Sequence, residues 1–349
     1  MFPDYLRSTA AQNILLPLFA LAGALLLFGA FIGLGGKDPI AAWGLLFKGA
    51  FGDSFSIQNT LQRAAPLMLT ALCVAIPARA GLTVIGGEGA LVLGALACAG
   101  LPYLLPSYLL PQNWFGSLLL LVAAALAGAL WIAIVGYLRQ NRGVNETISS
   151  LLMAYIAIGV FKHLVEGPMK DPASLNKPST LPLGDGLRIG MIEIGSFTSD
   201  VHWGLVWGLA ACLIAGVWLS LTTHGFAMQV VGGNARAAKL VGLPANRLII
   251  MACLLGGLCA GIAGGLEVAA VHSAANASVI VGLGYTGILV SFVARHNPWM
   301  IPIVAILFGG FAAAGSLLQR RLGVPDASVL VLQGFAFVLI LASEGWRKR

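Results

Sequence analysis

The sequence predicts an all-α protein embedded in a membrane, and its composition is the first reason. Of its 349 residues, 58% are hydrophobic and only 9% are charged, whereas a soluble globular protein carries about 25% charged residues. The second reason is that the apolar residues form runs of about twenty, the length that a helix needs to cross a bilayer. A membrane β-barrel would instead show shorter segments of alternating polarity.

Ten apolar runs are expected to cross the membrane as helices. They cover residues 14–35, 62–79, 83–101, 117–137, 147–161, 203–221, 248–271, 281–294, 299–317 and 328–343. We expect the first run to be a retained span rather than a signal peptide, because it is about twenty residues long and shows no small-residue cleavage pattern. The 45 glycines fit this interpretation, since small residues let membrane helices approach each other closely.

The distribution of charge orients these helices. With the N-terminus in the cytoplasm, the segments on that side carry eleven basic and three acidic residues, as the positive-inside rule requires. Ten spans then place the C-terminus in the cytoplasm as well. The net charge of +7 is spread thinly over the loops, so it does not indicate nucleic-acid binding.

Two runs are interrupted by residues that break helices. Pro66 and Pro77 lie in the second run, and glycines open the third. Such breaks are tolerated in a membrane only where protein or a water-filled cavity satisfies the freed backbone groups. They therefore favour a path through the membrane. Its candidate lining residues are Gly86, Gly87, Glu88, Gly89 and Glu267.

The two glutamates stand out because a charge at mid-membrane costs about 2.5 kcal/mol or more. For Glu88 two interpretations stay open. Its carboxylate either accepts hydrogen bonds from nearby backbone N–H groups and fixes the break in the helix, or it contacts a passing solute. For Glu267, which follows a face of small residues, we expect an interhelical hydrogen bond.

Short matches predict an inverted repeat inside a single domain of residues 1–349. The segment Arg142–Glu146 resembles Arg321–Asp326, and each follows an apolar run. Residues 62–161 would then recur as residues 247–343, and a displacement of five spans inverts the second copy. Inverted repeats recur in transporters, with the path at their interface. Asn145 is expected to cap the fifth run.

Two long loops have different characters. Residues 162–202 are polar, rich in proline and expected outside the cell. Residues 222–247 are expected inside, and Arg236, Lys239 and Arg247 give this loop a positive charge with no acidic residue. A short helix is predicted from Asn234, its N-cap, to Val241, with Gly242 just past its end. It either anchors to lipid headgroups or docks a cytoplasmic partner.

Motifs of catalysis are absent from the sequence. It contains no P-loop, no His-Glu-x-x-His and no Gly-x-Ser-x-Gly motif. The five histidines are dispersed, and the five cysteines lie in apolar runs without the spacing of metal ligands. We therefore expect neither a catalytic nor a metal site, and no cofactor bound by this chain.

Three segments resemble the permease subunits of ATP-binding cassette (ABC) importers for nucleosides and simple sugars. They are GLTVIGGEG at residues 81–89, RGVNETI at residues 142–148 and VGGNARAAKLVGL at residues 231–243. The resemblance extends over residues 60–343. In combination the motifs are specific to the branched-chain amino acid, ribose and nucleoside permease superfamily, and the first two indicate its nucleoside branch.

The resemblance implies a cobalamin-importer-like (type II) fold of ten helices in the bacterial inner membrane. It implies two cytoplasmic ATPase subunits, which bind ATP and Mg²⁺, and a substrate-binding protein. It also implies a second permease, either a different chain or a second copy of this one. The loop of residues 222–247 would contain a coupling helix that sits in a groove of the ATPase. The residues assigned to this coupling are Gly232, Asn234, Arg236, Ala237, Ala238, Lys239 and Gly242.

The sequence departs from the family pattern at three places. Thr83-Val84-Ile85, Ala90 and Ala154 stand where the family usually has Phe-Asn-Ile, Gln and Asn. Three amides that would hydrogen-bond a base or a sugar are missing. Either the substrate is different or less polar, or the second permease supplies these contacts.

Three alternatives to an importer subunit remain. An ion-coupled secondary transporter would use Glu88 or Glu267 as its proton site and would need no other subunit. An intramembrane enzyme or scaffold would need a catalytic pair, which the sequence does not offer. An ABC exporter of the same fold would lack a binding protein.

Overall fold

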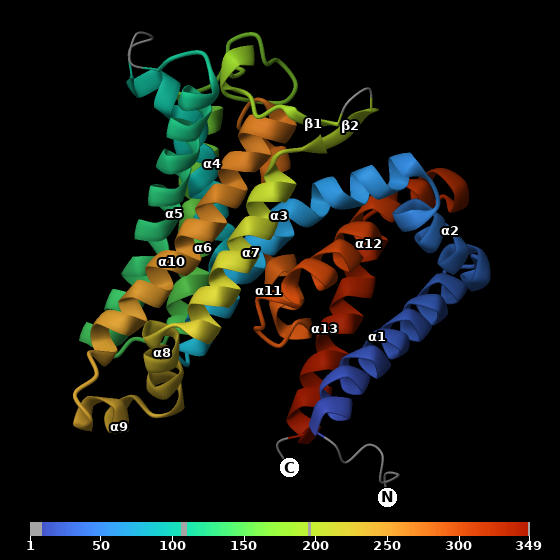
Figure 1. Ribbon diagram of the computed structural model, residues 1–349. Helices are drawn as coiled ribbons and strands as arrows, with labels where there is room; N and C mark the ends of the chain where they lie inside the picture. The colour runs from blue at the N-terminus through green and yellow to red at the C-terminus, as the bar shows by residue number, and fades with distance from the viewer. Residues whose placement is uncertain (1–8, 106–109, 195–196, 348–349) are drawn as a thin grey trace, which may run out of the picture. The chain divides into compact units, whose positions relative to one another are not determined.

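The structure, a computed structural model, describes residues 9–105, 110–194 and 197–347 of the chain. Helices make up most of it, and Figure 1 shows their order. The α-helices are α1 (Thr9–Leu34), α2 (Pro39–Phe51), α3 (Ser54–Arg79), α4 (Gly87–Leu104), α5 (Trp114–Arg142), α6 (Glu146–Glu166), α7 (Gly204–Leu221), α8 (Thr223–Gly233), α9 (Ala235–Leu240), α10 (Ala245–Leu266), α11 (Leu283–Val293), α12 (Ile301–Leu322) and α13 (Ser328–Arg347). The shorter elements are η2 (Asp185–Leu187), η3 (Glu267–His272), η4 (Ala277–Val279), β1 (Met191–Ile194) and β2 (Phe197–His202).

The prediction of a helical membrane protein is confirmed. Each of the ten apolar runs contains a helix. Within the described residues, seven helices are long and apolar enough to cross a membrane: α3, α4, α5, α6, α7, α10 together with η3, and α12. Shorter apolar helices cover residues 19–34, 39–51, 277–293 and 328–343.

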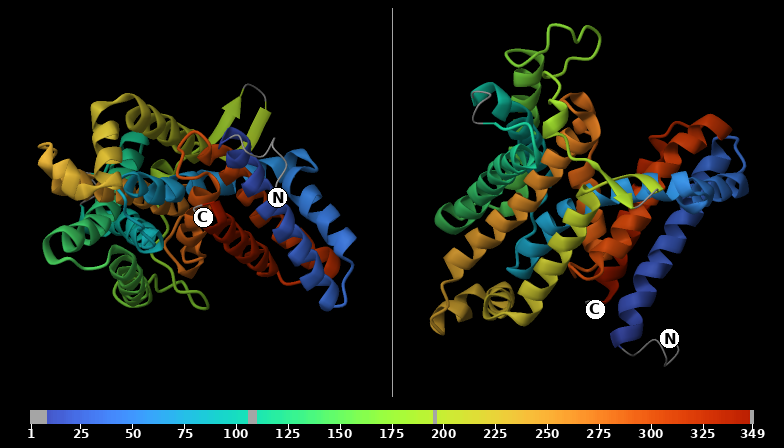
Figure 2. Two further views of the ribbon diagram at one scale, coloured as in Figure 1. Left: turned by 90° about the horizontal axis from the view of Figure 1, so that it is seen from below. Right: turned by 45° about the horizontal axis from the view of Figure 1, so that its top comes forward.

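Three features were not predicted: the helix α2, the helix α8 in the loop of residues 222–247, and a hairpin of two strands. The helix α2 begins with Asp38, whose side chain accepts a hydrogen bond from the backbone N–H of Ile40, followed by Pro39 in the first turn. This is an ordinary start of a helix. The antiparallel strands β1 and β2 form a hairpin before α7, visible as two arrows in Figure 2.

The contacts divide the chain into two compact units. One unit consists of residues 1–63 and 306–349, and the other of residues 64–305. In the first unit, α1 packs against α13, and a Cβ atom on Gly49 of α2 would lie 2.8 Å from the Cα atom of Ala314 in α12. The second unit contains all the candidate site residues.

The centre of the second unit is a close packing of α4, α5 and α10, which Figure 1 shows side by side. Glycines on α10 bring its backbone directly onto its neighbours. A Cβ atom on Gly257 would lie 2.3 Å from the carbonyl oxygen of Gly128, and one on Gly261 would lie 2.2 Å from that of Ala124. A Cβ atom on Gly264 would lie 1.9 Å from the carbonyl oxygen of Leu91. The small-residue face before Glu267 is therefore a helix interface.

Candidate functional site

The short helix predicted in the loop of residues 222–247 is confirmed as α9. Its N-cap is Asn234, whose side-chain oxygen accepts hydrogen bonds from the backbone N–H groups of Arg236 and Ala237, each at 3.0 Å. At the other end Gly242 has φ = +84°. Its N–H donates to the carbonyl oxygen of Lys239 at 3.1 Å, and the N–H of Leu243 donates to that of Ala238 at 3.0 Å. These two bonds form a Schellman motif.

The surface of α9 combines positive charge with apolar side chains. Arg236 and Lys239 are exposed, whereas Ala238 is fully buried. Leu240 and Val241 are 89% and 73% exposed. A short helix with such a face is suited to docking in a groove of another protein.

The helix α8, which leads into α9, sits directly on the turn that ends α3. A Cβ atom on Gly232 would lie 2.3 Å from the carbonyl oxygen of Arg79. On the other side, Gly81 has φ = +79°, and a Cβ atom there would lie 2.9 Å from the carbonyl oxygen of Gly232. The two backbones thus touch without any side chain between them.

The segment after this turn is extended and is held by the first turn of α6. Residues 82–85 have no helical structure. The N–H of Ile85 donates to Oγ of Ser150 at 3.0 Å, and Oγ1 of Thr147 donates to the carbonyl oxygen of Thr83 at 3.0 Å. The helix α6 itself begins as predicted, because the side chain of Asn145 accepts hydrogen bonds from two backbone N–H groups.

Glu88 lies in the first turn of α4 and is fully buried. One carboxylate oxygen accepts a hydrogen bond from the N–H of Gly282 at 2.9 Å, and the other accepts one from the N–H of Gly284 at 2.6 Å. Both donors belong to the start of α11, where Gly282 has φ = +82°. The carboxylate therefore joins the N-terminal ends of two helices, and the positive ends of both helix dipoles stabilise its charge.

Of the two interpretations of Glu88, the first describes this structure: the carboxylate accepts hydrogen bonds from backbone N–H groups. The backbone N–H groups come from α11, far away in the sequence, and not from the glycines beside Glu88.

The three glycines around Glu88 are buried in packed contacts. A Cβ atom on Gly86 would lie 2.6 Å from the carbonyl oxygen of Ser150, and one on Gly89 would lie 2.6 Å from the Cα atom of Ala154. A Cβ atom on Gly87 would lie 3.9 Å from the Cα atom of Gly284. Whether a solute passes here during transport stays a prediction.

Glu267 begins η3, a π-helix that continues α10. It is 8% exposed, and its Oε2 lies 3.5 Å from Nε2 of His272 at the other end of the same π-helix. Among the described interactions there is no contact between the carboxylates of Glu267 and Glu88.

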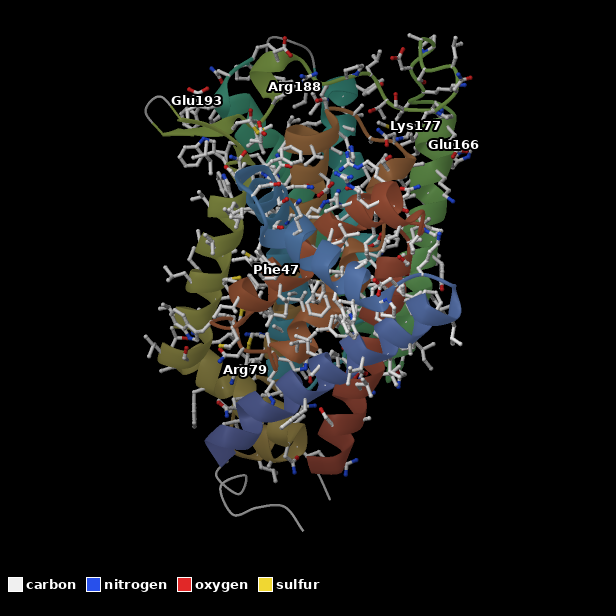
Figure 3. The ribbon with its side chains drawn as sticks, turned by 90° about the vertical axis from the view of Figure 1, so that its right-hand side faces the viewer. Phe47, Arg79, Glu166, Lys177, Arg188 and Glu193 are labelled. Atoms are coloured by element: carbon white, nitrogen blue, oxygen red, sulfur yellow. The ribbon has the colours of Figure 1, made fainter. Side chains whose placement is uncertain are left out.

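The long loop between α6 and α7 (residues 167–203, hereafter the long loop) is bonded to the segment between η3 and α11. The N–H of Leu183 donates to the carbonyl oxygen of Ser273 at 2.7 Å. Thr180, which is fully buried, bonds Ala275 twice: its N–H donates to the carbonyl oxygen at 2.9 Å, and its Oγ1 accepts from the N–H at 3.0 Å. Figure 3 shows Lys177 and Arg188 of the long loop at the opposite end of the second unit from Arg79.

His202, at the end of the long loop, provides a pH-dependent contact. It is 1% exposed, and burial lowers its pKa from 6.5 to about 4. Its neutral Nδ1 accepts a hydrogen bond from the N–H of Gly204 at 3.1 Å. Because the folded-state pKa lies below the unfolded value, the folded state is stabilised above pH 6.5, and this stabilisation is lost as the pH falls toward 4.

We therefore expect acidification from pH 7 to pH 4.5 to lower the thermal unfolding midpoint of the purified protein, through a loss approaching 3 kcal/mol. The variant His202→Gln should show a flatter pH profile, because it carries no charge at any pH. The matched control is His224→Gln, at an exposed position. If the unfolding midpoint of His202→Gln falls with acidification as steeply as that of wild type, His202 is not the group responsible.

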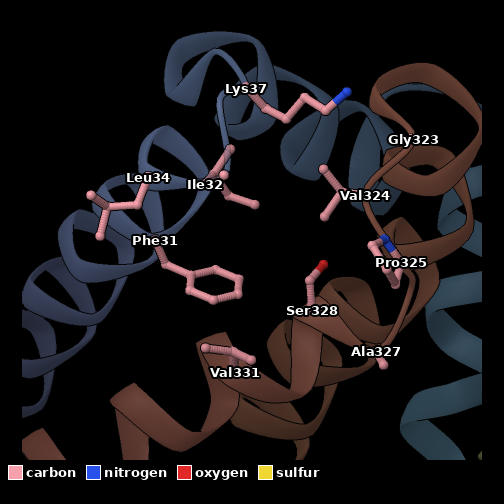
Figure 4. Close-up of a pocket in the computed structure, with 11 residues that line it drawn as sticks. Phe31, Ile32, Leu34, Lys37, Gly323, Val324, Pro325, Ala327, Ser328 and Val331 are labelled. Carbon is pink, nitrogen blue, oxygen red and sulfur yellow. The ribbon is translucent and has the colours of Figure 1, made fainter.

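A separate cleft of about 660 Å³ lies in the first unit, between the end of α1 and the start of α13. Figure 4 shows the amine of Lys37 at its rim and the hydroxyl of Ser328 among apolar side chains. None of the residues predicted for a site lines this cleft.

These features define a multi-pass helical membrane protein with a short, capped, positively charged helix between two of its spans. Residues 56–341 match the family described as "branched-chain amino acid transport system / permease component", and the chain therefore belongs to this family. It is the permease subunit of an ABC importer and not an enzyme, which confirms the resemblance found in the sequence.

Curated relatives extend over nearly the whole chain. The glucose ABC transporter permease protein TsgB13 of Haloferax volcanii is 32% identical over 95% of this chain and 88% of its own length. The guanosine ABC transporter permease protein NupP of Bacillus subtilis is 28% identical over 96% of this chain and 95% of its own length. A second guanosine permease protein of that organism, NupQ, is 27% identical over 82% of this chain and 91% of its own length.

Proposed function

We propose that this chain forms part of the translocation path for a nucleoside or a simple sugar, delivered by a binding protein and moved by ATP hydrolysis on separate subunits. Support for the substrate class comes from the relatives, which are named for glucose and guanosine. The observation that carries the mechanism is the contact of Gly232 with Arg79 and Gly81. It connects the exposed helix α9 to the non-helical residues 82–85 between α3 and α4. The break expected at Pro66 and Pro77 is absent, because α3 continues through both prolines.

The proposed membrane arrangement has ten spans in a cobalamin-importer-like fold, with both termini in the cytoplasm of a bacterial cell. The proposed inverted repeat relates residues 62–161 to residues 247–343 within one permease domain. Under this relation α4 corresponds to α11. Both helices follow a non-helical segment and begin beside glycines, which supports the correspondence.

The partners we propose are two ATPase subunits, a binding protein and a second permease. Bacillus subtilis has two differently named guanosine permeases, NupP and NupQ, both similar to this chain. We therefore favour a pair of different permeases over a homodimer. The second permease would supply the polar contacts that Ala90 and Ala154 lack here.

The residues proposed for coupling are those around α9. Asn234 and Gly242 fix the two ends of this helix, and Gly232 seats α8 on the turn after α3. Arg236 and Lys239 offer positive charge to the ATPase, with Ala237 and Ala238 between them on the helix. ATP and Mg²⁺ would be bound by the ATPase subunits and not by this chain.

We expect the charge reversal Arg236→Glu to weaken the association with the ATPase subunits at least about tenfold, which corresponds to about 1.4 kcal/mol. The reason is that the variant places a negative charge where the proposed interface uses a positive one. Copurification from native membranes measures this. The matched control is Arg188→Glu, which reverses an arginine at the opposite end of the second unit (Figure 3). Equal recovery of the ATPase with Arg236→Glu would contradict the assignment.

The proposed function is tested by gentle detergent purification of the chain from its native membrane and mass spectrometry of what accompanies it. We expect a P-loop ATPase and a second permease, and a complex whose ATP hydrolysis is stimulated by a nucleoside or a sugar with its binding protein. If the chain is isolated alone and moves a solute in vesicles under an ion gradient, the alternative of an ion-coupled transporter through Glu88 or Glu267 replaces this proposal.

A further inference from the structure

We infer that Glu88 is the joint through which the long loop and the docking helix α9 act on each other. This inference rests on the proposed function, since it concerns how binding-protein docking and ATP hydrolysis are coupled. It assigns Glu88 a positioning role between two arms of the second unit. Each arm contains a non-helical segment, and the two arms meet at the Glu88 carboxylate.

The first arm leads from the long loop to Glu88. Backbone hydrogen bonds from Thr180 and Leu183 tie the loop to Ala275 and Ser273. A further backbone bond joins Ile189 to Ala269 of η3 at 3.0 Å. From Ser273 the chain continues through η4 to Gly282, whose N–H bonds Glu88. A displacement of the long loop therefore moves the start of α11.

The second arm leads from Glu88 to α9. The extended residues 82–85 connect the start of α4 to the turn at Gly81, and this turn touches Gly232. Gly232 belongs to α8, which ends at the N-cap of α9. A displacement of α9 by an ATPase is therefore transmitted to residues 82–85 through a contact of two backbones.

At the joint, geometry and charge both hold the two arms together. Gly284 approaches α4 so closely that a Cβ atom there would lie 2.2 Å from the backbone nitrogen of Glu88. The carboxylate spans two N–H groups two residues apart, so it fixes the register of α11 on α4. A charge in a low-dielectric interior keeps such partners, because losing them leaves it uncompensated. The starts of α4 and α11 thus move as one piece.

The test uses the purified complex in lipid vesicles and compares wild type, Glu88→Gln and Glu146→Gln. In Glu88→Gln the amide nitrogen accepts no hydrogen bond, so one of the two bonds to α11 is lost. The control Glu146→Gln changes another carboxylate at a helix start. Its side chain pairs with Arg139 at 3.2 Å and has no described bond to residues 82–85 or to the start of α11. The measured quantity is the ratio of ATP hydrolysis with and without loaded binding protein.

We expect Glu88→Gln to lower this ratio at least about tenfold, and Glu146→Gln to keep it within twofold of wild type. A role in folding alone would reduce the amount of complex and change both rates together, leaving the ratio unchanged. If Glu88→Gln shows the same ratio as wild type, Glu88 does not couple the two arms and the inference is overturned. An unstimulated wild type, by contrast, speaks against the proposed function.

A second measurement tests the joint without a known substrate. The five cysteines of this chain are all buried. A fluorescent label attached to the isolated Leu175→Cys chain, at an 83% exposed position of the long loop, before the complex is assembled therefore reports that loop. We expect nucleotide trapped in the ATPase to change the signal in wild type and to leave it unchanged in Glu88→Gln. The same change in both proteins overturns the inference.

Discussion

Replacing Gly232 by leucine is expected to reduce substrate uptake about 100-fold. This factor is near the upper end of the range by which one site in a protein changes the affinity of another. The side chain would have to enter a contact in which a Cβ atom alone lies 2.3 Å from the carbonyl oxygen of Arg79. The end of α8 must then move away from the turn after α3, and α9 would no longer act on residues 82–85. Uptake of labelled substrate by cells measures the loss.

The neighbouring glycine provides the control for this prediction. A Cβ atom on Gly233 meets no atom within 4 Å, so Gly233→Leu adds the same side chain one position further along the same helix without a clash. Both variants should reach the membrane in wild-type amounts, since the change lies outside the apolar spans. Normal uptake by Gly232→Leu would disprove the role of this contact.

The second large effect is expected for Gly264→Leu, which should prevent the second unit from packing. A Cβ atom on Gly264 would lie 1.9 Å from the carbonyl oxygen of Leu91 and 2.7 Å from the backbone nitrogen of Ala95. Backbone atoms do not yield as side chains do, so α10 would have to separate from α4. The cost should exceed the roughly 3 kcal/mol typical of an overpacked core.

Detergent extraction followed by size-exclusion chromatography measures this loss as a missing monodisperse peak. The matched control is Gly159→Leu on α6, where a Cβ atom meets nothing within 4 Å and the position is exposed. A monodisperse, heat-stable Gly264→Leu protein would show that α10 and α4 tolerate a wider separation than this packing indicates.

Features encoded in short stretches of sequence could be predicted. Each of the ten apolar runs contains a helix in the structure, and Asn234 and Gly242 marked the ends of α9. Each of these signals is local: a cap residue bonds N–H groups two and three positions away, and hydrophobic length needs no partner. The helix α2 carried the same kind of signal in Asp38-Pro39, but its 13 residues are too few for a span.

The partners of Glu88 could not be predicted in this way. Its carboxylate bonds residues 194 and 196 positions away in the sequence. The spacing of apolar residues along the chain contains no information on a pairing over such a distance. One signal was present: under the proposed repeat, the glycines of the eighth run, Gly282 and Gly284, correspond in place to those around Glu88 at the start of the third. The contact of Gly81 with Gly232 was likewise hidden, because glycine has no side chain whose chemistry suggests a partner.

The double capping of α9 has a consequence for the speed of subunit assembly. A helix of six residues is unstable by itself in water, since nucleation costs more than so few hydrogen bonds return. Here Asn234 at one end and the Gly242 turn at the other hold it folded before any partner arrives. In the docking proposed above, no backbone would have to be ordered, and the entropy of binding would be less unfavourable. The ATPase would meet a preformed shape, so association would proceed at the rate of orientation and diffusion rather than of folding.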